Sequence, residues 1–256
     1  MSERKVMVTG GAGFIGSHIV DALLNKGYKV VIVDDLSTGV RNNINNKAKF
    51  YNADIRDIKK LREIFRKEKP DILNHHAAQI SVTDSVKDPK KDIEINYYGT
   101  LNLLKCAIDN CVEKIIFASS SAIYGEVKKS ELPVSESLTP RPLTPYGINK
   151  YACELCLEMF FRLYGLPYIS LRYSNVFGPR QNAKGEAGVI AIFTTRMLRG
   201  KTPLIYGDGY QTRDFIYVDD VVRANILAIE NKKIKHLNLS IINLSKPKQP
   251  DNFNFS

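Results

Sequence analysis

Three glycines near the N-terminus, Gly10, Gly13 and Gly16, constrain the fold of this chain more than any other feature. The apolar run at residues 6–9 before them is typical of a buried strand, and residues 17–26 after them have the spacing of an amphipathic helix. Glycines at this spacing permit a tight turn, a close approach of the backbone to a pyrophosphate, and packing of the helix on the strand. Orphan N–H groups at the helix N-terminus then favour a bound anion. The segment therefore predicts a dinucleotide-binding site.

A carboxylate at the end of the second predicted strand, residues 29–33, narrows the choice of dinucleotide. Asp34 can accept hydrogen bonds from an adenosine ribose diol and repel a 2′-phosphate, which favours NAD over NADP. Arg41 could meet a 2′-phosphate, but it lies further along the loop. The alternative is a solvated aspartate that begins the loop 34–39. With the glycines in place, NAD is the cofactor we expect.

Short apolar runs alternate with amphipathic runs through the first two thirds of the chain. Further strands are predicted at residues 49–53, 71–75, 114–119 and 168–172, and helices at residues 58–67, 93–110 and 146–164. Continuous apolar strands between helices indicate an α/β fold with a doubly wound parallel sheet, the Rossmann type, which binds ligands at the carboxyl ends of its strands. Past residue 175 the alternation loosens, and a helix at 188–198 and a short strand at 203–206 fit a smaller lobe.

Charge and hydropathy bear on the possible partners. The net charge of +10 raises nucleic acid as a partner, but the lysines and arginines are scattered and form no basic block. No apolar run approaches the ~20 residues that a membrane span needs, and the first residues lead directly into a strand without room for a signal peptide. We expect a cytoplasmic protein that binds neither nucleic acid nor membrane.

Two of the four cysteines, Cys153 and Cys156, form a C-x-x-C pattern that raises metal or redox chemistry. Both fall inside the predicted helix 146–164, where residues three apart share a face. Without a second such pair or a cluster of histidines, buried helix cysteines are the simpler interpretation. We therefore expect no metal, and the cytoplasmic setting argues against disulfides.

A tyrosine and a lysine four residues apart, Tyr146 and Lys150, open the same predicted helix with both side chains on one face. Tyrosine, with a pKa of ~10, is a poor base at neutral pH, but an ammonium group and a cationic nicotinamide ring would both stabilise its phenolate. Ser120, at the end of the preceding strand, is placed to hydrogen-bond the hydroxyl that Tyr146 deprotonates. An exposed helix face and a serine loop that satisfies its own backbone are the alternatives. The order of these motifs along the chain favours a catalytic site.

With these motifs in this order, the sequence resembles the extended short-chain dehydrogenases/reductases, and among them the NAD-dependent sugar-nucleotide epimerase/dehydratase family. Residues 52–56, 76–79, 96–100, 171–181 and 207–215 also carry the resemblance, which runs from residue 5 to about residue 230. It implies cofactor contacts from Gly10, Gly13, Phe14, Ile15, Gly16, Asp34, Asp35, Leu36, Ser37, Thr38, Gly39, Asp54, Ile55, Ala77, Ala78, Gln79, Asn96, Ser119, Tyr146, Lys150 and Tyr173. It implies substrate contacts from Ser120, Ser121, Tyr146, Asn175, Val189, Tyr206 and Arg213, the last of which could instead form an ion pair with Asp214 or Asp219.

The reaction that the resemblance implies is epimerisation at C4 of a UDP-sugar of the glucose/galactose type. C4 would give a hydride to NAD while Tyr146, assisted by Lys150 and Ser120, takes the proton of the 4-hydroxyl, and the 4-keto intermediate would then receive the hydride on its other face. Family members that dehydrate or decarboxylate usually carry a glutamate two residues before the tyrosine at Tyr124, where this chain has Ala122. Decarboxylation, 4-keto reduction and a catalytically silent NAD-binding protein remain the alternatives.

The family's organisation implies two parts. Residues 1–174, with 214–232 returning to them, would form the NAD-binding domain, and residues 175–213 and 233–256 an incomplete lobe for the sugar nucleotide. Family members usually continue with a glycine-containing strand and a segment that closes the sugar pocket. Residues 236–240 here lack those glycines. We therefore expect an altered or truncated C-terminus with a poorly ordered tail, and the resemblance implies a homodimer.

Overall fold

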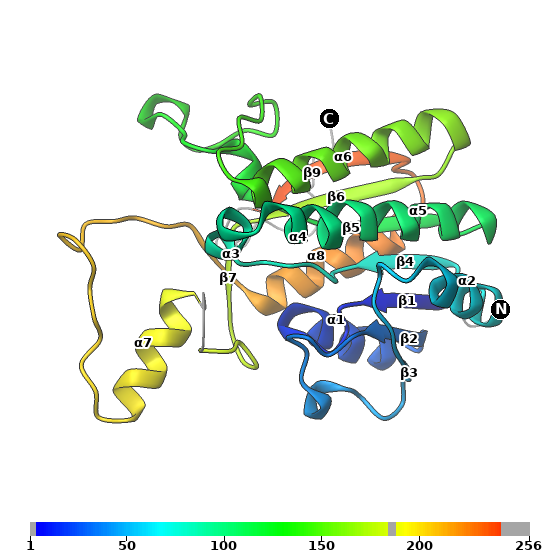
Figure 1. Cartoon of the computed structure of the whole chain (residues 1–256), viewed down its shortest axis with the longest axis horizontal. Coiled ribbons are helices and arrows are strands. Elements are labelled where there is room, and N and C mark those ends of the chain that lie inside the picture. Colours follow the sequence, from blue (N-terminus) through cyan, green and yellow to red (C-terminus); the bar gives the residue numbers. More distant parts are fainter. Residues whose placement is uncertain (1–3, 184–187, 242–256) are drawn as a thin grey trace.

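A seven-stranded parallel sheet with helices on both faces forms the centre of the structure, a computed structural model that describes residues 4–183 and 188–241 (Figure 1). Its strands lie in the order β3-β2-β1-β4-β5-β6-β9. Their bounds are β1 Lys5–Thr9, β2 Lys29–Asp34, β3 Lys49–Asn52, β4 Ile72–His75, β5 Lys114–Ser120, β6 Tyr168–Tyr173 and β9 His236–Ile241. The strand order reverses between β1 and β4, and the carboxyl ends at such a switch point border a crevice for ligands.

Two layers of helices bury the two faces of this sheet. The helices of the described residues are α1 Phe14–Asn25, α2 Ile58–Glu68, α3 Val82–Lys87, α4 Pro89–Ile93, α5 Gly99–Asp109, α6 Pro145–Tyr164, α7 Val189–Leu198 and α8 Val218–Glu230, of which α7 stands away from the sheet. Successive strand residues point to opposite faces, so Met7 packs with α2, α5 and α6, whereas Val6 and Val8 pack with α1 and α8. The predicted α/β fold with a doubly wound parallel sheet is confirmed.

Two predicted elements differ from the structure. The helix predicted at 93–110 begins earlier, as α4, and passes through a π-helical turn, η2 (Glu94–Tyr98), before α5. The strand predicted at 203–206 is wrong, because that segment has no partner strand and is irregular. A two-stranded parallel sheet instead joins β7 (Asn175–Phe177) to β8 (Phe215–Tyr217).

Local signals set both ends of α6, the longest helix of the described residues. Thr144 caps the N-terminus, where its side chain accepts a hydrogen bond from the Gly147 N–H at 3.2 Å, and Pro145 occupies the first turn. Gly165 ends the helix in the left-handed conformation at φ 67°. These signals fix where α6 begins, and therefore where Tyr146 lies relative to the carboxyl end of β5.

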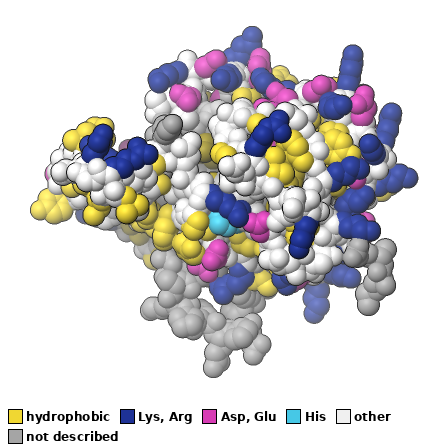
Figure 2. All heavy atoms as spheres, turned by 90° about the horizontal axis from the view of Figure 1, so that it is seen from below, with side chains coloured by type: hydrophobic (Ala, Val, Ile, Leu, Met, Phe, Trp, Pro, Cys, Tyr) yellow, Lys and Arg dark blue, Asp and Glu magenta, His cyan; other side chains and the backbone are white. Residues whose placement is uncertain are grey.

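The surface mixes charges and carries one apolar extension. On the face shown in Figure 2, lysine and arginine side chains are scattered among acidic and neutral ones, and hydrophobic side chains gather on the part that protrudes at the left. That part is α7 and the segment after it, which stand away from the sheet in Figure 1 and expose Met197, Leu198, Tyr206 and Tyr210. Within the described residues, no helix combines the length and the apolar character needed to cross a bilayer.

All four cysteines are free, and three of them are buried. Cys153 and Cys156 lie in α6, where Cys153 donates to the Asn96 carbonyl and Cys156 to the Tyr97 hydroxyl. In the part of the chain that the structure describes, no cluster of histidine, cysteine and carboxylate side chains is arranged to hold a metal ion.

Candidate active site

The glycine loop between β1 and α1 has no room for a side chain at Gly10 or Gly16. Gly10 has φ +70°, and a Cβ there would lie 2.6 Å from the Ala77 backbone nitrogen, so this loop touches the segment after β4. A Cβ on Gly16 would lie 2.1 Å from the Gly10 carbonyl oxygen. Gly13 is the N-cap of α1 and offers no side-chain acceptor to the first turn. The loop therefore combines close backbone packing with an uncapped helix N-terminus, which suits a phosphate anion.

Asp34 lies beside this loop, as the last residue of β2, with 7% of its surface exposed. Its two carboxylate oxygens accept hydrogen bonds from the Ala12 and Leu36 N–H groups, each at 2.9 Å. Burial raises the pKa of this carboxyl, and the two backbone bonds oppose that rise. A carboxylate has about four lone-pair sites, so Asp34 retains acceptor capacity for a ligand diol.

The loop after Asp34 folds back over the glycine loop. The Val40 N–H donates to the Ala12 carbonyl at 3.0 Å, and a Cβ on Gly39 would meet an Asp34 oxygen at 2.6 Å. Arg41 is exposed in a short helical turn.

Two histidines, His75 at the end of β4 and His76 directly after it, belong to the site. Their hydrogen bonds could not be predicted from the sequence. The ring nitrogens of His75 lie 2.7 Å from the Thr9 hydroxyl and 3.0 Å from the Thr100 hydroxyl, and Thr100 donates to the Asn96 carbonyl at 2.6 Å. Thr100 must therefore accept from Nε2–H of His75. Burial first, and the charge of Lys150 second, hold the pKa of His75 well below its usual range, so this ring is neutral.

His76 and Tyr173 stack beside each other at the same edge. Nε2 of His76 lies 2.9 Å from the Tyr173 hydroxyl, which also accepts from Asn225 at 2.7 Å. The pKa of His76 falls to about 3 because of burial and the charge of Lys150. The hydroxyl of Tyr173, a residue expected to contact the cofactor, is thus held by α8 and His76, and only 6% of the residue is exposed.

Tyr146, Lys150 and Ser120 converge where α6 passes the carboxyl end of β5. Lys150 donates to the Ala118 carbonyl at 2.8 Å, and its Nζ lies 5.9 Å from the centre of the Tyr146 ring. Burial raises the pKa of Tyr146 to about 12, and a side-chain hydrogen bond with Ser120 opposes this rise. Burial lowers the pKa of Lys150 to about 8. The structure therefore brings together a buried ammonium and a phenol and a hydroxyl that are partly exposed.

Several polar atoms at this edge lack partners among the described residues. The hydroxyl oxygens of Ser119 and Ser174 and Nδ1 of His76 are buried without a hydrogen bond. Buried polar groups of this kind are costly unless something satisfies them. Together with the glycine loop and Asp34, they fit a polar ligand such as a dinucleotide.

Asn96 supports the segment after β4. Its side-chain amide donates to the Gln79 carbonyl and accepts from the Gln79 N–H, each at 2.9 Å. Asp54, expected to contact the cofactor, pairs with Arg56 at 2.6 Å, and Ile55 packs against Gly99.

The residues expected to hold the substrate lie further out. Asn175 donates to the Asp214 carbonyl at 2.9 Å, and Arg213 is exposed and donates to its neighbour's carbonyl at 2.7 Å. Val189 and Tyr206 lie in the protruding part, with Tyr206 79% exposed. In the described part of the chain, Arg213 pairs with neither Asp214 nor Asp219, and the structure does not bring Val189 or Tyr206 into contact with Tyr146.

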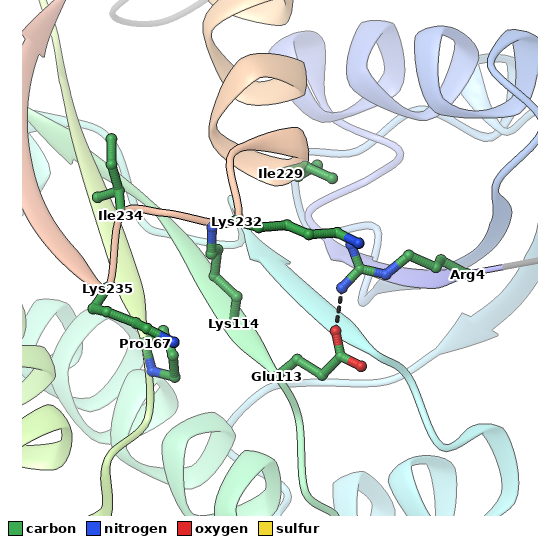
Figure 3. Close-up of a pocket in the computed structure, with 8 residues that line it drawn as sticks. All are labelled: Arg4, Glu113, Lys114, Pro167, Ile229, Lys232, Ile234 and Lys235. Atoms are coloured by element: carbon green, nitrogen blue, oxygen red, sulfur yellow. Dashed lines mark hydrogen bonds and ion pairs between the residues drawn. The ribbon is translucent and has the colours of Figure 1, made fainter. Parts of the chain in front are cut away.

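A cavity of about 320 Å³ lies at the opposite edge of the sheet (Figure 3). Its lining includes Arg4, Glu113 and Lys235, each of which directly precedes a strand. Arg4 and Glu113 form an ion pair there. The cavity is thus at the amino ends of the strands and contains none of the predicted site residues, so we place the candidate active site at the carboxyl edge.

Comparison with known proteins gives close matches. Residues 6–242 match the NAD dependent epimerase/dehydratase family. A protein of Methanocaldococcus jannaschii named putative UDP-glucose 4-epimerase is 52% identical over 228 residues, which are 89% of this chain and 74% of that protein.

Two solved structures are also similar. The UDP-glucose 4-epimerase of Thermotoga maritima with UDP-glucose is 50% identical, with a TM-score of 0.89 over 93% of this chain and 76% of its own. The UDP-glucose 4-epimerase of Thermus thermophilus complexed with NAD is 45% identical, with a TM-score of 0.86 over 91% and 76%.

Proposed function

Because this chain belongs to the NAD dependent epimerase/dehydratase family, as its motifs led us to expect, we propose that it epimerises UDP-sugars at C4, interconverting compounds such as UDP-glucose and UDP-galactose. The observation that carries this proposal is the convergence of Tyr146, Lys150 and Ser120 at the same carboxyl end of the sheet as the glycine loop. Ala122, in the place where dehydrating members usually carry a glutamate, removes the acid or base that water loss would need.

The cofactor of this family is NAD. When bound, it supplies a positive charge and a hydride acceptor, which becomes the hydride donor in the reverse step. The glycine loop and the N-terminus of α1 would hold its pyrophosphate and Asp34 its adenosine ribose. The other residues that we propose to contact it are Phe14, Ile15, Asp35, Leu36, Ser37, Thr38, Gly39, Asp54, Ile55, Ala77, Ala78, Gln79, Asn96, Ser119, Tyr146, Lys150 and Tyr173.

Tyr146 is the proposed base that takes the proton of the sugar 4-hydroxyl and returns it when the 4-keto intermediate is reduced. A pKa of about 12 keeps the phenol neutral in the protein alone, so positive charge near it must lower that pKa for catalysis. Lys150 supplies part of that charge and is anchored to Ala118. Ser120 stabilises the phenolate by hydrogen bonding and would also hydrogen-bond the 4-oxygen of the substrate.

The proposed substrate contacts lie further from the sheet than the cofactor contacts. Asn175 and Arg213 would hold the diphosphate while the sugar turns between its two reductions, and Ser121, Val189 and Tyr206 would contact the nucleotide or sugar. We propose residues 1–174 and 214–232 as the cofactor part and residues 175–213 as the substrate part. The pairing of β9 with β6 supports counting residues 236–241 with the cofactor sheet rather than with the lobe.

We also propose that the chain forms a homodimer in the cytoplasm. Ile148, Leu155, Met159 and Leu163 are exposed on one face of α6, at a spacing that places them side by side. Ile93 and Tyr98 extend apolar exposure onto α4 and η2, which pack against α6. Free cysteines are consistent with a reducing compartment. Sedimentation of the wild type and of a Leu155→Glu, Leu163→Glu variant tests the interface, because charge there should yield monomers.

Product analysis tests the proposed reaction directly. The purified chain is incubated with added NAD and, separately, with UDP-glucose, UDP-galactose and UDP-N-acetylglucosamine. Proton NMR distinguishes the C4 epimers, and mass spectrometry reports loss of water or carbon dioxide. We expect a C4 epimer of unchanged mass without net formation of NADH. A product that has lost mass, or NADH formed in step with product, would favour other chemistry of the family.

A further inference from the structure

A buried carboxylate, Asp92, faces the catalytic helix from α4. We propose that Asp92 is a positioning residue: it joins the Tyr146–Lys150 turn of α6 to the cofactor segment after β4, and its charge acts on both catalytic groups. This inference rests on the proposed function, since it assigns a role within the same site.

Three hydrogen bonds from three segments converge on this side chain, which is 0% exposed. Oδ2 of Asp92 accepts from the Asn149 amide at 2.6 Å, and Oδ1 accepts from the Gln79 amide at 2.8 Å and from the Asn96 amide at 3.1 Å. Gln79 follows β4, Asn96 lies in η2, and Asn149 lies in α6. Asp92 is therefore the junction of these three segments.

All three partners are neutral amide donors, which explains why the junction requires a carboxylate. An asparagine in place of Asp92 could accept on one oxygen, but its NH₂ would then face at least one other donor. Among the described residues, Asp92 forms no ion pair, so its charge is supported by the amides alone. A buried carboxylate held in this way projects its field into nearby groups.

Asn149 links this junction to the two catalytic residues of α6. It directly precedes Lys150 and follows Tyr146 by three residues, so its bond to Asp92 fixes the rotation of that turn of α6. On the other side of the same turn, Lys150 is fixed to the Ala118 carbonyl at 2.8 Å. The turn is thus held from β5 and from α4, and Gln79 connects the second anchor to the cofactor segment.

The charge of Asp92 has a defined effect on each catalytic group. It raises the pKa of Tyr146, in the same direction as burial, and it raises the pKa of Lys150, against burial. Cys153 and Glu154 from α6 also raise the pKa of Lys150. His75 and His76 face Lys150 from β4 and the segment after it, with pKa values held below their usual range. Removing the Asp92 charge should therefore lower the pKa of both catalytic groups.

Two variants separate position from charge. Asp92→Asn removes the charge and retains the shape, whereas Asn149→Ala breaks the link and retains the charge. Asp84→Asn, an exposed carboxylate on the adjacent helix α3, is the control. NMR of protein with isotope-labelled lysine follows the ammonium of Lys150, assigned from the resonance that Lys150→Arg removes, with and without NAD.

We expect the Lys150 titration midpoint, about 8 in the wild type, to fall by about one pH unit in Asp92→Asn and to stay unchanged in Asn149→Ala and Asp84→Asn. Asp92→Asn and Asn149→Ala should each lower kcat for UDP-galactose about 10- to 100-fold with little change in KM. An unchanged midpoint in Asp92→Asn overturns the charge effect. If Asp92→Asn does not fold, Asn149→Ala alone tests the positioning role. A kcat for Asn149→Ala equal to that of the wild type overturns this role. Absence of epimerisation in the wild type refutes the proposed function, and the titration still decides whether Asp92 acts on Lys150.

Discussion

Replacing Gly16 with alanine sets two effects against each other. Alanine is favoured over glycine inside a helix by about 1 kcal/mol, so propensity alone predicts a more stable protein. The added Cβ, however, would lie 2.1 Å from the Gly10 carbonyl oxygen and 3.0 Å from the Gly11 Cα, both rigid backbone atoms. The start of α1 must then move away from the glycine loop by roughly 1 Å, an overpacking that costs about 3 kcal/mol or more. We expect a net loss of about 2 kcal/mol in the free energy of unfolding.

The same movement should disturb the cofactor site. We expect the Kd for NAD to rise at least about tenfold, which corresponds to about 1.4 kcal/mol. Urea unfolding gives the stability and titration calorimetry gives the affinity. Gly165→Ala, at the C-terminal end of α6, is the control, because its φ of +67° strains any residue with a Cβ whereas nothing lies within 4 Å of that Cβ. That variant should bind NAD as the wild type does. If Gly16→Ala is as stable as the wild type and binds NAD equally well, the close-packing argument is refuted.

Three further predictions concern single side chains. Asp34→Ala should weaken NAD binding by about 2–3 kcal/mol and reduce discrimination against NADP; an unchanged preference in a binding titration would contradict the assignment. Ser120→Ala should raise the pKa of Tyr146, since Ser120 lowers it, and so shift the acid limb of the rate profile to higher pH while NAD affinity stays constant. Lys150→Met should raise the free energy of unfolding at pH 7, by up to about 3 kcal/mol, because folding lowers the pKa of this lysine from 10.5 to about 8. The unfolded chain binds more protons between those values, so the gain should shrink as urea titrations move from pH 8 toward 10.5, and a constant gain would argue against the buried ammonium.

Much of the architecture could be predicted from local patterns. The glycine loop, the buried strands and the spacing of Tyr146 and Lys150 are each encoded within a few residues. The structure places the glycine loop and the Tyr146–Lys150 pair at the carboxyl end of those strands. The helix predicted at 93–110 began too late because the polar start of α4 shows little apolar periodicity, although Pro89 is a typical first-turn residue. The apolar run at 203–206 resembles a strand but finds no neighbour to pair with.

The polar network behind the site could not be predicted in the same way. Thr9, His75 and Thr100 come from separate segments, and only the folded sheet brings them into contact. The same is true of Asp92 and Asn149, which are 57 residues apart and meet at 2.6 Å. The spacing of Asp92 and Asn96 on adjacent turns was the only sequence signal of that junction.

The proposed chemistry is tested most directly by Tyr146→Phe, measured together with the wild type. The wild type should convert UDP-galactose to UDP-glucose with added NAD and no net NADH. The variant should lose about 10² to 10⁴ in rate, since it lacks the proton acceptor, and should bind NAD with nearly the wild-type Kd. A variant that retains more than a tenth of the wild-type rate would contradict the role of Tyr146. A wild type that binds NAD and UDP-galactose but produces no epimer would contradict the proposed function itself.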